Sequence, residues 1–158
     1  MTAKRVVLIT GAGTGIGAAT CRRFARDGAT IVLCGIDAAP LNKVADELTA
    51  SGVTALSVPM DVTDAAARDA LFDTIEARFG RLDLLVNNAA ILGQAALAPA
   101  ATQSLDHFER IVSVNLTAAF AMAQKAYPLL RDSGGSIVNV SSVGGSAAQF
   151  NGAAYCAT

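Results

Sequence analysis

Short runs of β-branched and aliphatic residues alternate along the chain with longer segments in which apolar residues recur every three or four positions. The short runs predict buried strands and the longer segments predict amphipathic helices, because side chains repeat with different periods in the two structures. The predicted strands are residues 5–10, 30–34, 55–59, 82–86 and 136–140. The predicted helices are residues 17–27, 40–51, 64–79 and 104–131. Strands and helices therefore alternate without interruption.

Single residues mark the ends of two of these helices. Asp64 follows a threonine and is typical of a helix N-cap, and Gly80 is typical of a helix C-terminus. Pro128 lies inside the last helical pattern and predicts a kink or an early end there.

The pattern fits one fold class. Strands that are apolar throughout, and that are separated by helices, are typical of a parallel sheet covered on both faces. We find no repeat, no low-complexity segment and no linker between the elements. The sequence therefore predicts a single α/β domain over residues 1–158, a doubly wound, Rossmann-like parallel sheet with five strands.

Composition excludes several functional classes. The 158 residues are 53% hydrophobic and 16% charged, which excludes a disordered chain. Twelve basic and thirteen acidic residues leave a net charge of −1, and Trp is absent, so we expect no nucleic-acid partner. No stretch provides about 20 predominantly apolar residues, so we expect no membrane span.

The cysteines and other metal-ligand types are scattered. Three cysteines, Cys21, Cys34 and Cys156, show no CxxC spacing and fit a reducing, cytoplasmic location. No group of His, Cys or carboxylate residues has the spacing of metal ligands, so we expect no metal.

The first predicted strand runs directly into a glycine-rich turn, residues 10–17, which reads Thr-Gly-Ala-Gly-Thr-Gly-Ile-Gly. Glycines between a strand and a helix let backbone N–H groups approach a pyrophosphate at the helix N-terminus. The turn therefore predicts nucleotide binding. The spacing of its glycines fits more than one class of nucleotide-binding protein. The usual dinucleotide spacing fits only from Gly13, with Ala18 last; Thr-Gly-x-x-x-Gly-x-Gly fits from Thr10; and Gly-x-Gly-x-Gly, as in methyltransferases that bind S-adenosylmethionine, fits from Gly11.

Five motifs in order resemble the short-chain dehydrogenase/reductase family, and the resemblance runs over all 158 residues. The motifs are Thr10-Gly11-x-x-x-Gly15-x-Gly17, Asp61-Val62 after the third strand, Asn87-Asn88-Ala89-Ala90 after the fourth, Asn115, and the pair Ser142 and Tyr155. Asp61-Val62 resembles the family's contact with the adenine of the cofactor. Ala90 stands where the family's Asn-Asn-Ala-Gly signature ends in glycine. The methyltransferase alternative explains neither residues 87–90 nor the serine–tyrosine pair.

The resemblance implies a dinucleotide-binding Rossmann domain for NAD or NADP. The implied cofactor-binding residues are Gly11, Thr14, Gly15, Ile16, Gly17, Asp37, Asp61, Val62, Asn88, Ala89, Ala90 and Tyr155. An acidic side chain at the end of the second strand favours NAD because it accepts hydrogen bonds from the ribose and repels a 2′-phosphate. Gly35 occupies the family's acidic position and Asp37 follows two residues later, with no basic residue before Lys43. These features favour NAD over NADP.

The resemblance also implies a reaction, hydride transfer between the nicotinamide and a secondary alcohol or ketone. Tyr155 would be the general acid/base, Ser142 would hydrogen-bond the substrate oxygen, and Asn115 would hold a water that relays the proton. A free tyrosine has a pKa of about 10 and is a poor base at neutral pH. In the family a lysine four residues after the tyrosine assists it, and that position would follow Thr158.

We therefore expect the C-terminal part of the domain to be missing from this sequence. The 158-residue chain alone is expected to have negligible dehydrogenase activity and poor solubility. A non-catalytic nucleotide-binding module is the alternative reading. For the full-length protein, the resemblance implies a small-molecule alcohol or ketone substrate. It also implies a homodimer or homotetramer formed through the helix at residues 104–131 and through the expected helix that is missing from this sequence.

Overall fold

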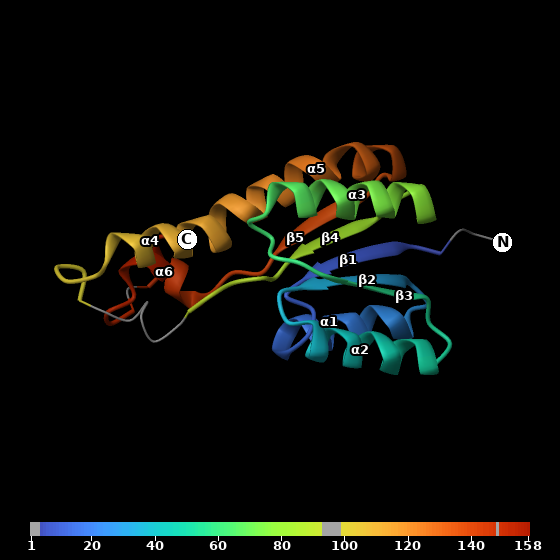
Figure 1. The fold of residues 1–158 in the computed structure, drawn as a ribbon, viewed down its shortest axis with the longest axis horizontal. Coiled ribbons are helices and arrows are strands. Elements are labelled where there is room, and N and C mark those ends of the chain that lie inside the picture. The colour runs from blue at the N-terminus through green and yellow to red at the C-terminus, as the bar shows by residue number, and fades with distance from the viewer. Residues whose placement is uncertain (1–3, 93–98, 148) are drawn as a thin grey trace.

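A computed structural model of the protein describes residues 4–92, 99–147 and 149–158 (Figure 1). Five parallel strands form one sheet in the order β3-β2-β1-β4-β5. The strands are β1 (Val6–Thr10), β2 (Thr30–Gly35), β3 (Ala55–Pro59), β4 (Leu84–Asn87) and β5 (Ser136–Asn139). The predicted doubly wound parallel sheet is therefore confirmed.

The helices connect successive strands. They are α1 (Gly15–Arg26), α2 (Ala38–Ala50), α3 (Ala65–Phe79), α4 (Leu105–Val112), α5 (Ala118–Ser133) and the short α6 (Ala153–Cys156). A π-helical turn at Ser113–Thr117 joins α4 to α5, and a 3₁₀ turn lies at Val143–Gly145. None of the helices in the described ranges combines the length and apolar character needed to cross a membrane.

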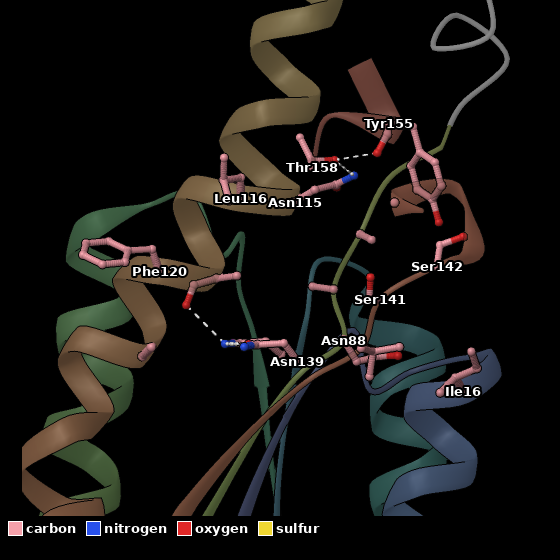
Figure 2. Close-up of a pocket in the computed structure, with 17 residues that line it drawn as sticks. Ile16, Asn88, Asn115, Leu116, Phe120, Asn139, Ser141, Ser142, Tyr155 and Thr158 are labelled. Atoms are coloured by element: carbon pink, nitrogen blue, oxygen red, sulfur yellow. Dashed lines mark hydrogen bonds between the residues drawn. The ribbon is translucent and has the colours of Figure 1, made fainter. Parts of the chain in front are cut away.

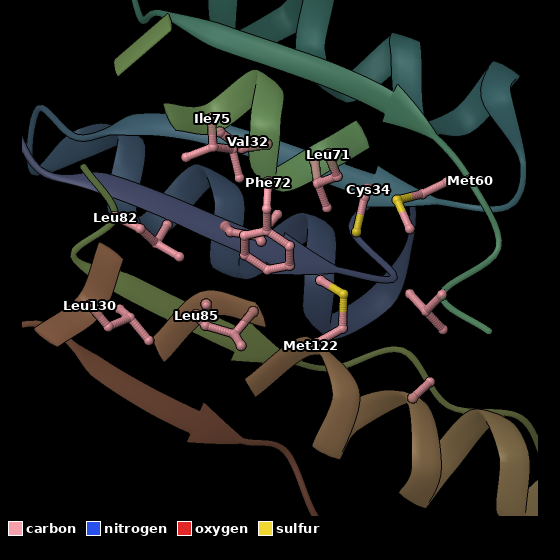
Figure 3. Close-up of a cluster of buried hydrophobic side chains, with 14 of the residues drawn as sticks. Val32, Cys34, Met60, Leu71, Phe72, Ile75, Leu82, Leu85, Met122 and Leu130 are labelled. Carbon is pink, nitrogen blue, oxygen red and sulfur yellow. The ribbon is translucent and has the colours of Figure 1, made fainter. Parts of the chain in front are cut away.

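Alternate side chains of the central strands pack into two separate cores. Val7 and Ile9 of β1 belong to the core under α1 and α2, whereas Leu8 belongs to the core under α3 and α5. Figure 1 shows these two helix pairs on opposite faces of the sheet. In the second core, Phe72 of α3 and Met122 of α5 meet over the sheet (Figure 3). The apolar runs thus form strands because both faces of each central strand are covered.

The ends of α3 are as the sequence predicts. Asp64 is the N-cap, and its Oδ1 accepts hydrogen bonds from the N–H groups of Ala66 and Ala67 at 2.9 and 3.1 Å. Gly80 ends the helix in the left-handed conformation, with φ of 64°. Both features satisfy backbone groups that a helix end leaves without intrahelical partners.

The predicted helix at residues 104–131 is divided, but not at the proline. The π-helical turn separates α4 from α5, whereas α5 continues past Pro128 to Ser133, so the early end predicted there is wrong. Pro128 and Gln124, whose carbonyl loses its helical partner, are both exposed. Water can therefore solvate that carbonyl, and the helix tolerates the proline.

The edge strand β5 departs from the predicted coverage on both faces. Its four residues are all exposed, and Ile137 and Val138 are 39% and 47% accessible. Coverage on both faces therefore holds for β1 and β2, whose side chains are almost all buried, and fails for β5.

The strand order places a topological switch point between β1 and β4. The chain proceeds from β1 outward to β2 and β3, and then crosses back to β4 on the other side of β1. In open α/β sheets, ligands bind in the crevice beyond the carboxyl ends of the strands at such a point. The glycine turn follows β1 there, and Asn88 follows β4.

Candidate functional site

Two adjoining cavities lie at the carboxyl edge of the sheet. The first, the turn cavity, has a volume of about 490 Å³, and the second, the tyrosine cavity, about 520 Å³. The turn cavity is lined by Gly11, Thr14, Gly15, Ile16, Gly35, Ile36, Met60, Asp61, Val62, Asn88, Ala89, Ala90, Ile91, Arg110 and Val114. The tyrosine cavity shares Ile16, Asn88, Ala89 and Ala90 with it and adds Asn115, Ser142 and Tyr155, among others. One elongated ligand could therefore occupy both.

The glycine turn leaves a free helix N-terminus beside the turn cavity. Gly15 has φ of 51°, and a methyl group added to it would meet no atom within 4 Å. A methyl group on Gly17 would lie 2.2 Å from the Gly11 carbonyl oxygen, so only glycine fits there. Thr14, the N-cap of α1, makes no side-chain capping bond, and the first turn of α1 has no acidic residue. The N-terminus of α1 can therefore bind an anion.

Thr10 and Asn88 fasten the glycine turn to the loop after β4. The buried Thr10 hydroxyl accepts hydrogen bonds from the N–H groups of Asn88 and Ala89, both at 2.9 Å. The Asn88 side-chain amide donates to the carbonyls of Thr10 and Gly11, at 2.9 and 3.2 Å. These bonds hold the shared wall of the two cavities in one position.

The far end of the turn cavity combines apolar walls with one ion pair. Asp61 follows β3 and accepts hydrogen bonds from the Thr63 N–H, the Thr63 hydroxyl and the Arg110 guanidinium at 2.9, 2.7 and 2.9 Å. Burial opposes ionisation of Asp61. The hydrogen bonds from Thr63 and Arg110, together with the Arg110 charge, outweigh it and lower the pKa of Asp61 to about 2. The carboxylate is therefore ionised at any physiological pH.

Asp37 lies apart from this group. It is the N-cap of α2 and is exposed, and it does not belong to the described residues that line either cavity. The residue that lines the turn cavity beyond β2 is Ile36, which is 67% accessible. The predicted contact of Asp37 with a ribose therefore needs a rearrangement of its side chain toward the cavity.

The Asn115 side chain fastens two other segments of the chain. It lies in the π-helical turn, where its Oδ1 accepts from the Ile91 N–H at 2.9 Å. Its Nδ2 donates to the Ile91 carbonyl and to the Thr158 hydroxyl, both at 3.2 Å. Asn115 therefore anchors the segment after β4 through a two-point amide contact, and the water that we predict for it stays a prediction.

Ser142 and Tyr155 face each other in the tyrosine cavity. In Figure 2 the Tyr155 hydroxyl points toward the Ser142 hydroxyl. Ser142 follows β5, and its Oγ accepts from the Gly144 N–H at 3.2 Å. Tyr155 lies on α6, which is held against α4 by contact between the buried residues Ala154 and Ile111. Among the described lining residues of this cavity none is charged.

Sequence reasoning missed some residues that shape the site. The sequence marks Thr10 only as the start of the turn, and its hydrogen bonds to the β4 loop follow from strand pairing in space. The sequence does not mark Arg110, which lies 49 residues after the carboxylate that it contacts. Nothing in the local pattern signals this pairing. We predict that Gly17 contacts the cofactor, and its close packing against Gly11 adds a structural role that the sequence does not indicate.

The donors and the shape fit a nicotinamide dinucleotide. The N-terminus of α1, which can bind an anion, lies where the two cavities adjoin. Gly15 has no side chain, so a ligand can approach the backbone closely there. A dinucleotide has a central pyrophosphate with one base on each side, so the apolar end near Val62 and the end near Tyr155 would receive its two bases. The residues present therefore fit this cofactor.

Comparisons with known proteins agree with this geometry. Residues 5–158 match the family described as short chain dehydrogenase. The chain is 43% identical over 157 residues to (5R,7aS)-5-hydroxy-7a-methyl-1-oxo-2,3,5,6,7,7a-hexahydro-1H-indene-carboxyl-CoA reductase of Mycobacterium tuberculosis, covering 98% of this chain and 59% of the relative.

Two solved structures superimpose closely. A 3-ketoacyl-ACP reductase from Sinorhizobium meliloti 1021 has a TM-score of 0.89 and 35% identity, over 96% of this chain and 60% of that one. An NAD⁺-bound xylitol dehydrogenase has a TM-score of 0.90 and 34% identity, over 98% of this chain and 60% of that one. The chain thus spans about three fifths of the length of these relatives.

Proposed function

The chain belongs to the short-chain dehydrogenase family, and we propose that the whole protein transfers a hydride between a nicotinamide cofactor and a secondary alcohol or ketone. One observation carries the proposal. Ser142 and Tyr155, with facing hydroxyl groups, line a cavity that adjoins the glycine-turn cavity. The three relatives described above are named as reductases or dehydrogenases, which supports the same reaction class.

The roles follow from the chemistry of the reaction. When bound, the cofactor supplies or accepts the hydride. Oxidation of an alcohol also releases the hydroxyl proton, and we assign its acceptance to the Tyr155 oxygen. The Ser142 hydroxyl donates a hydrogen bond to the substrate oxygen and stabilises the negative charge that develops there. Asn115 holds the Ile91 segment in place and so fixes the wall between cofactor and substrate.

We propose NAD as the preferred cofactor. Arg110 is the one cationic side chain among the described residues that line the turn cavity, and it is already paired with Asp61. A 2′-phosphate near Gly35 and Ile36 would therefore find no free cation to bind. The NAD⁺-bound xylitol dehydrogenase supports this preference.

We also propose that copies of the protein associate through α5. Phe120 and Tyr127 lie on one face of this helix and are 68% and 60% accessible, and Leu116 just before it is 49% accessible. An exposed apolar stripe of this kind is typical of an interface. Light scattering after size-exclusion chromatography should give a multiple of the chain mass, and Phe120→Glu should give the single-chain mass.

The first test is ligand-linked stabilisation of the chain. NAD should raise the melting temperature, NADP should do so less at equal concentration, and S-adenosylmethionine should have no effect. Gly15→Ala places a methyl group in the turn cavity and should weaken NAD binding by at least about tenfold. Gly80→Ala is the matched control, because Gly80 also has positive φ and open space but lies outside both cavities. Stabilisation by S-adenosylmethionine instead of NAD would refute the proposal.

A second candidate function is a nucleotide-binding module without turnover. The observation in its favour is that no charged side chain among the described residues lines the tyrosine cavity, so none of them assists Tyr155 as a cation. The two candidates differ in one assay. Both predict that this chain binds NAD, but only the oxidoreductase predicts that the whole protein forms NADH with some member of a panel of secondary alcohols.

A further inference from the structure

Asp61 is held at the end of the turn cavity by two segments that are far apart in sequence. On one side, the Thr63 N–H and hydroxyl both donate to Asp61 Oδ1, at 2.9 and 2.7 Å. On the other side, Nη2 of Arg110, on α4, donates to Asp61 Oδ2 at 2.9 Å, and Nη1 donates to the Thr63 hydroxyl at 3.2 Å. The carboxylate therefore has both oxygen atoms engaged and a fixed orientation.

This fixed carboxylate lies where one base of a dinucleotide would bind. Asp61 and Arg110 line the turn cavity together with the apolar residues Ile36 and Val62. The side chains of Arg110 and Asp61 are 47% and 31% accessible, so the pair forms part of the cavity rim and is not buried in the core. A base lying between the apolar walls would present its edge to the Asp61 carboxylate.

The family resemblance already implies that Asp61 contacts the adenine of the cofactor. We propose that Arg110 is a positioning residue that orients Asp61 for this contact, in which Asp61 accepts a hydrogen bond from the exocyclic amino group. This inference rests on the proposed function, since it concerns the adenine half of the same cofactor. A carboxylate accepts a hydrogen bond from an amino group and repels a carbonyl oxygen. The site therefore distinguishes adenine from hypoxanthine, which has a carbonyl at the same position.

Arg110 has two effects on this recognition. Its hydrogen bond to Oδ2 prevents rotation of the Asp61 side chain away from the cavity, where water would otherwise compete for it. Its positive charge offsets the cost of keeping the carboxylate beside an apolar base, because an unpaired anion in such a place is poorly solvated. An oxygen atom that already accepts one hydrogen bond still has a lone pair for a second donor.

The test compares the affinities of NAD and nicotinamide hypoxanthine dinucleotide, measured by calorimetric titration of the chain. Wild type should bind NAD at least about tenfold more tightly than nicotinamide hypoxanthine dinucleotide. Arg110→Gln should reduce this ratio to about threefold or less. Arg110→Lys keeps one charged donor and should give an intermediate ratio. The ratio is informative because a merely structural loss would weaken both ligands equally.

Two further variants separate the proposed role from general effects. Arg22→Gln removes a comparable two-pronged ion pair, with Glu47, outside both cavities and should leave the ratio unchanged. Asp61→Ala should remove the discrimination, and adding Arg110→Gln to it should change nothing more, because Arg110 acts through Asp61.

Each outcome decides the matter. An unchanged ratio in Arg110→Gln, with both affinities reduced in parallel, would overturn the inference and leave the proposed function intact. A ratio that rises in this variant would also overturn it, since Arg110 would then compete with adenine for Asp61. Wild type that binds neither dinucleotide would overturn the proposed function, and the inference with it.

Discussion

Replacing Thr10 by valine tests whether the wall between the two cavities depends on one buried hydroxyl. Thr10 is 2% accessible, and its hydroxyl accepts from the N–H groups of Asn88 and Ala89. Valine has nearly the same shape, so the substitution removes the acceptor and leaves the strand packing in place. On apolar burial and strand propensity alone, valine at this position in β1 would be expected to stabilise the sheet.

The hydrogen bonds predict the opposite sign. A buried donor that loses its acceptor costs roughly 1–3 kcal/mol. Two donors are affected, but both belong to half-buried residues beside a cavity, where water can partly replace the hydroxyl. We therefore expect a loss of about 2–3 kcal/mol in the free energy of unfolding. For a domain of this size, that loss corresponds to a fall of about 4–12 °C in melting temperature.

The measurement is urea unfolding followed by circular dichroism, with Thr10→Ser as the matched control. Serine keeps the hydroxyl and removes only one methyl group, so it should cost about 1 kcal/mol. NAD affinity should follow the same order, because residues 88–90 line both cavities. A valine variant as stable as wild type, or less destabilised than the serine variant, would refute the hydrogen-bond argument.

Three further predictions concern other parts of the site. Gly17→Ala should destabilise the chain and abolish its thermal stabilisation by NAD, because the added methyl group would lie 2.2 Å from the Gly11 carbonyl oxygen. Thermal melts with and without NAD check this prediction, and a variant that NAD still stabilises would contradict it. Asn115→Asp keeps the acceptor for the Ile91 N–H but replaces the donor to the Ile91 carbonyl by a second acceptor. It should therefore lower the urea midpoint at pH 7 more than at pH 4, where the new carboxyl group is partly protonated. Because the folded-state pKa of Asp61 is about 2, below its ordinary value, its ionised form stabilises the fold above about pH 4. This contribution is lost as the pH falls through 2, so the stability difference between wild type and Asp61→Asn should be smaller at pH 2.5 than at pH 6.

The sequence predicts the elements of this fold well where a residue's conformation depends on its near neighbours. Strand runs, the Asp64 cap and the Gly80 end of α3 are local features, and the structure contains each of them. The exposure of β5 cannot be read from its own residues in the same way. Its apolar residues read like those of β1, and whether they are buried depends on which elements lie beside the strand in space.

The same distinction between local features and partners in space applies to the candidate site. The motif residues were predicted because family resemblance identifies them one by one, and the structure brings most of them to two adjoining cavities. The role of Asn115 was harder to predict. The π-helical turn at Ser113–Thr117 is a distortion within a continuous apolar pattern, and the partner of the Asn115 side chain is the backbone of Ile91, which any residue type could supply.

The segment from α4 to the π-helical turn is the element that connects the two ends of the site. Arg110 contacts Asp61 at the rim of the turn cavity, and the next residue, Ile111, packs on Ala154 of the helix that carries Tyr155. Asn115 then fastens Ile91, which contacts the same Ile111–Ala154 cluster. Since a helix is stiff over this length, a shift of α4 at Arg110 would move the support of Tyr155 as well. Binding of adenine at Asp61 should therefore reduce hydrogen exchange at residues 153–157, and adenosine monophosphate, which reaches only the turn cavity, should suffice to produce this protection. Protection confined to the glycine turn and the Asp61 loop would show that the two ends of the site are mechanically independent.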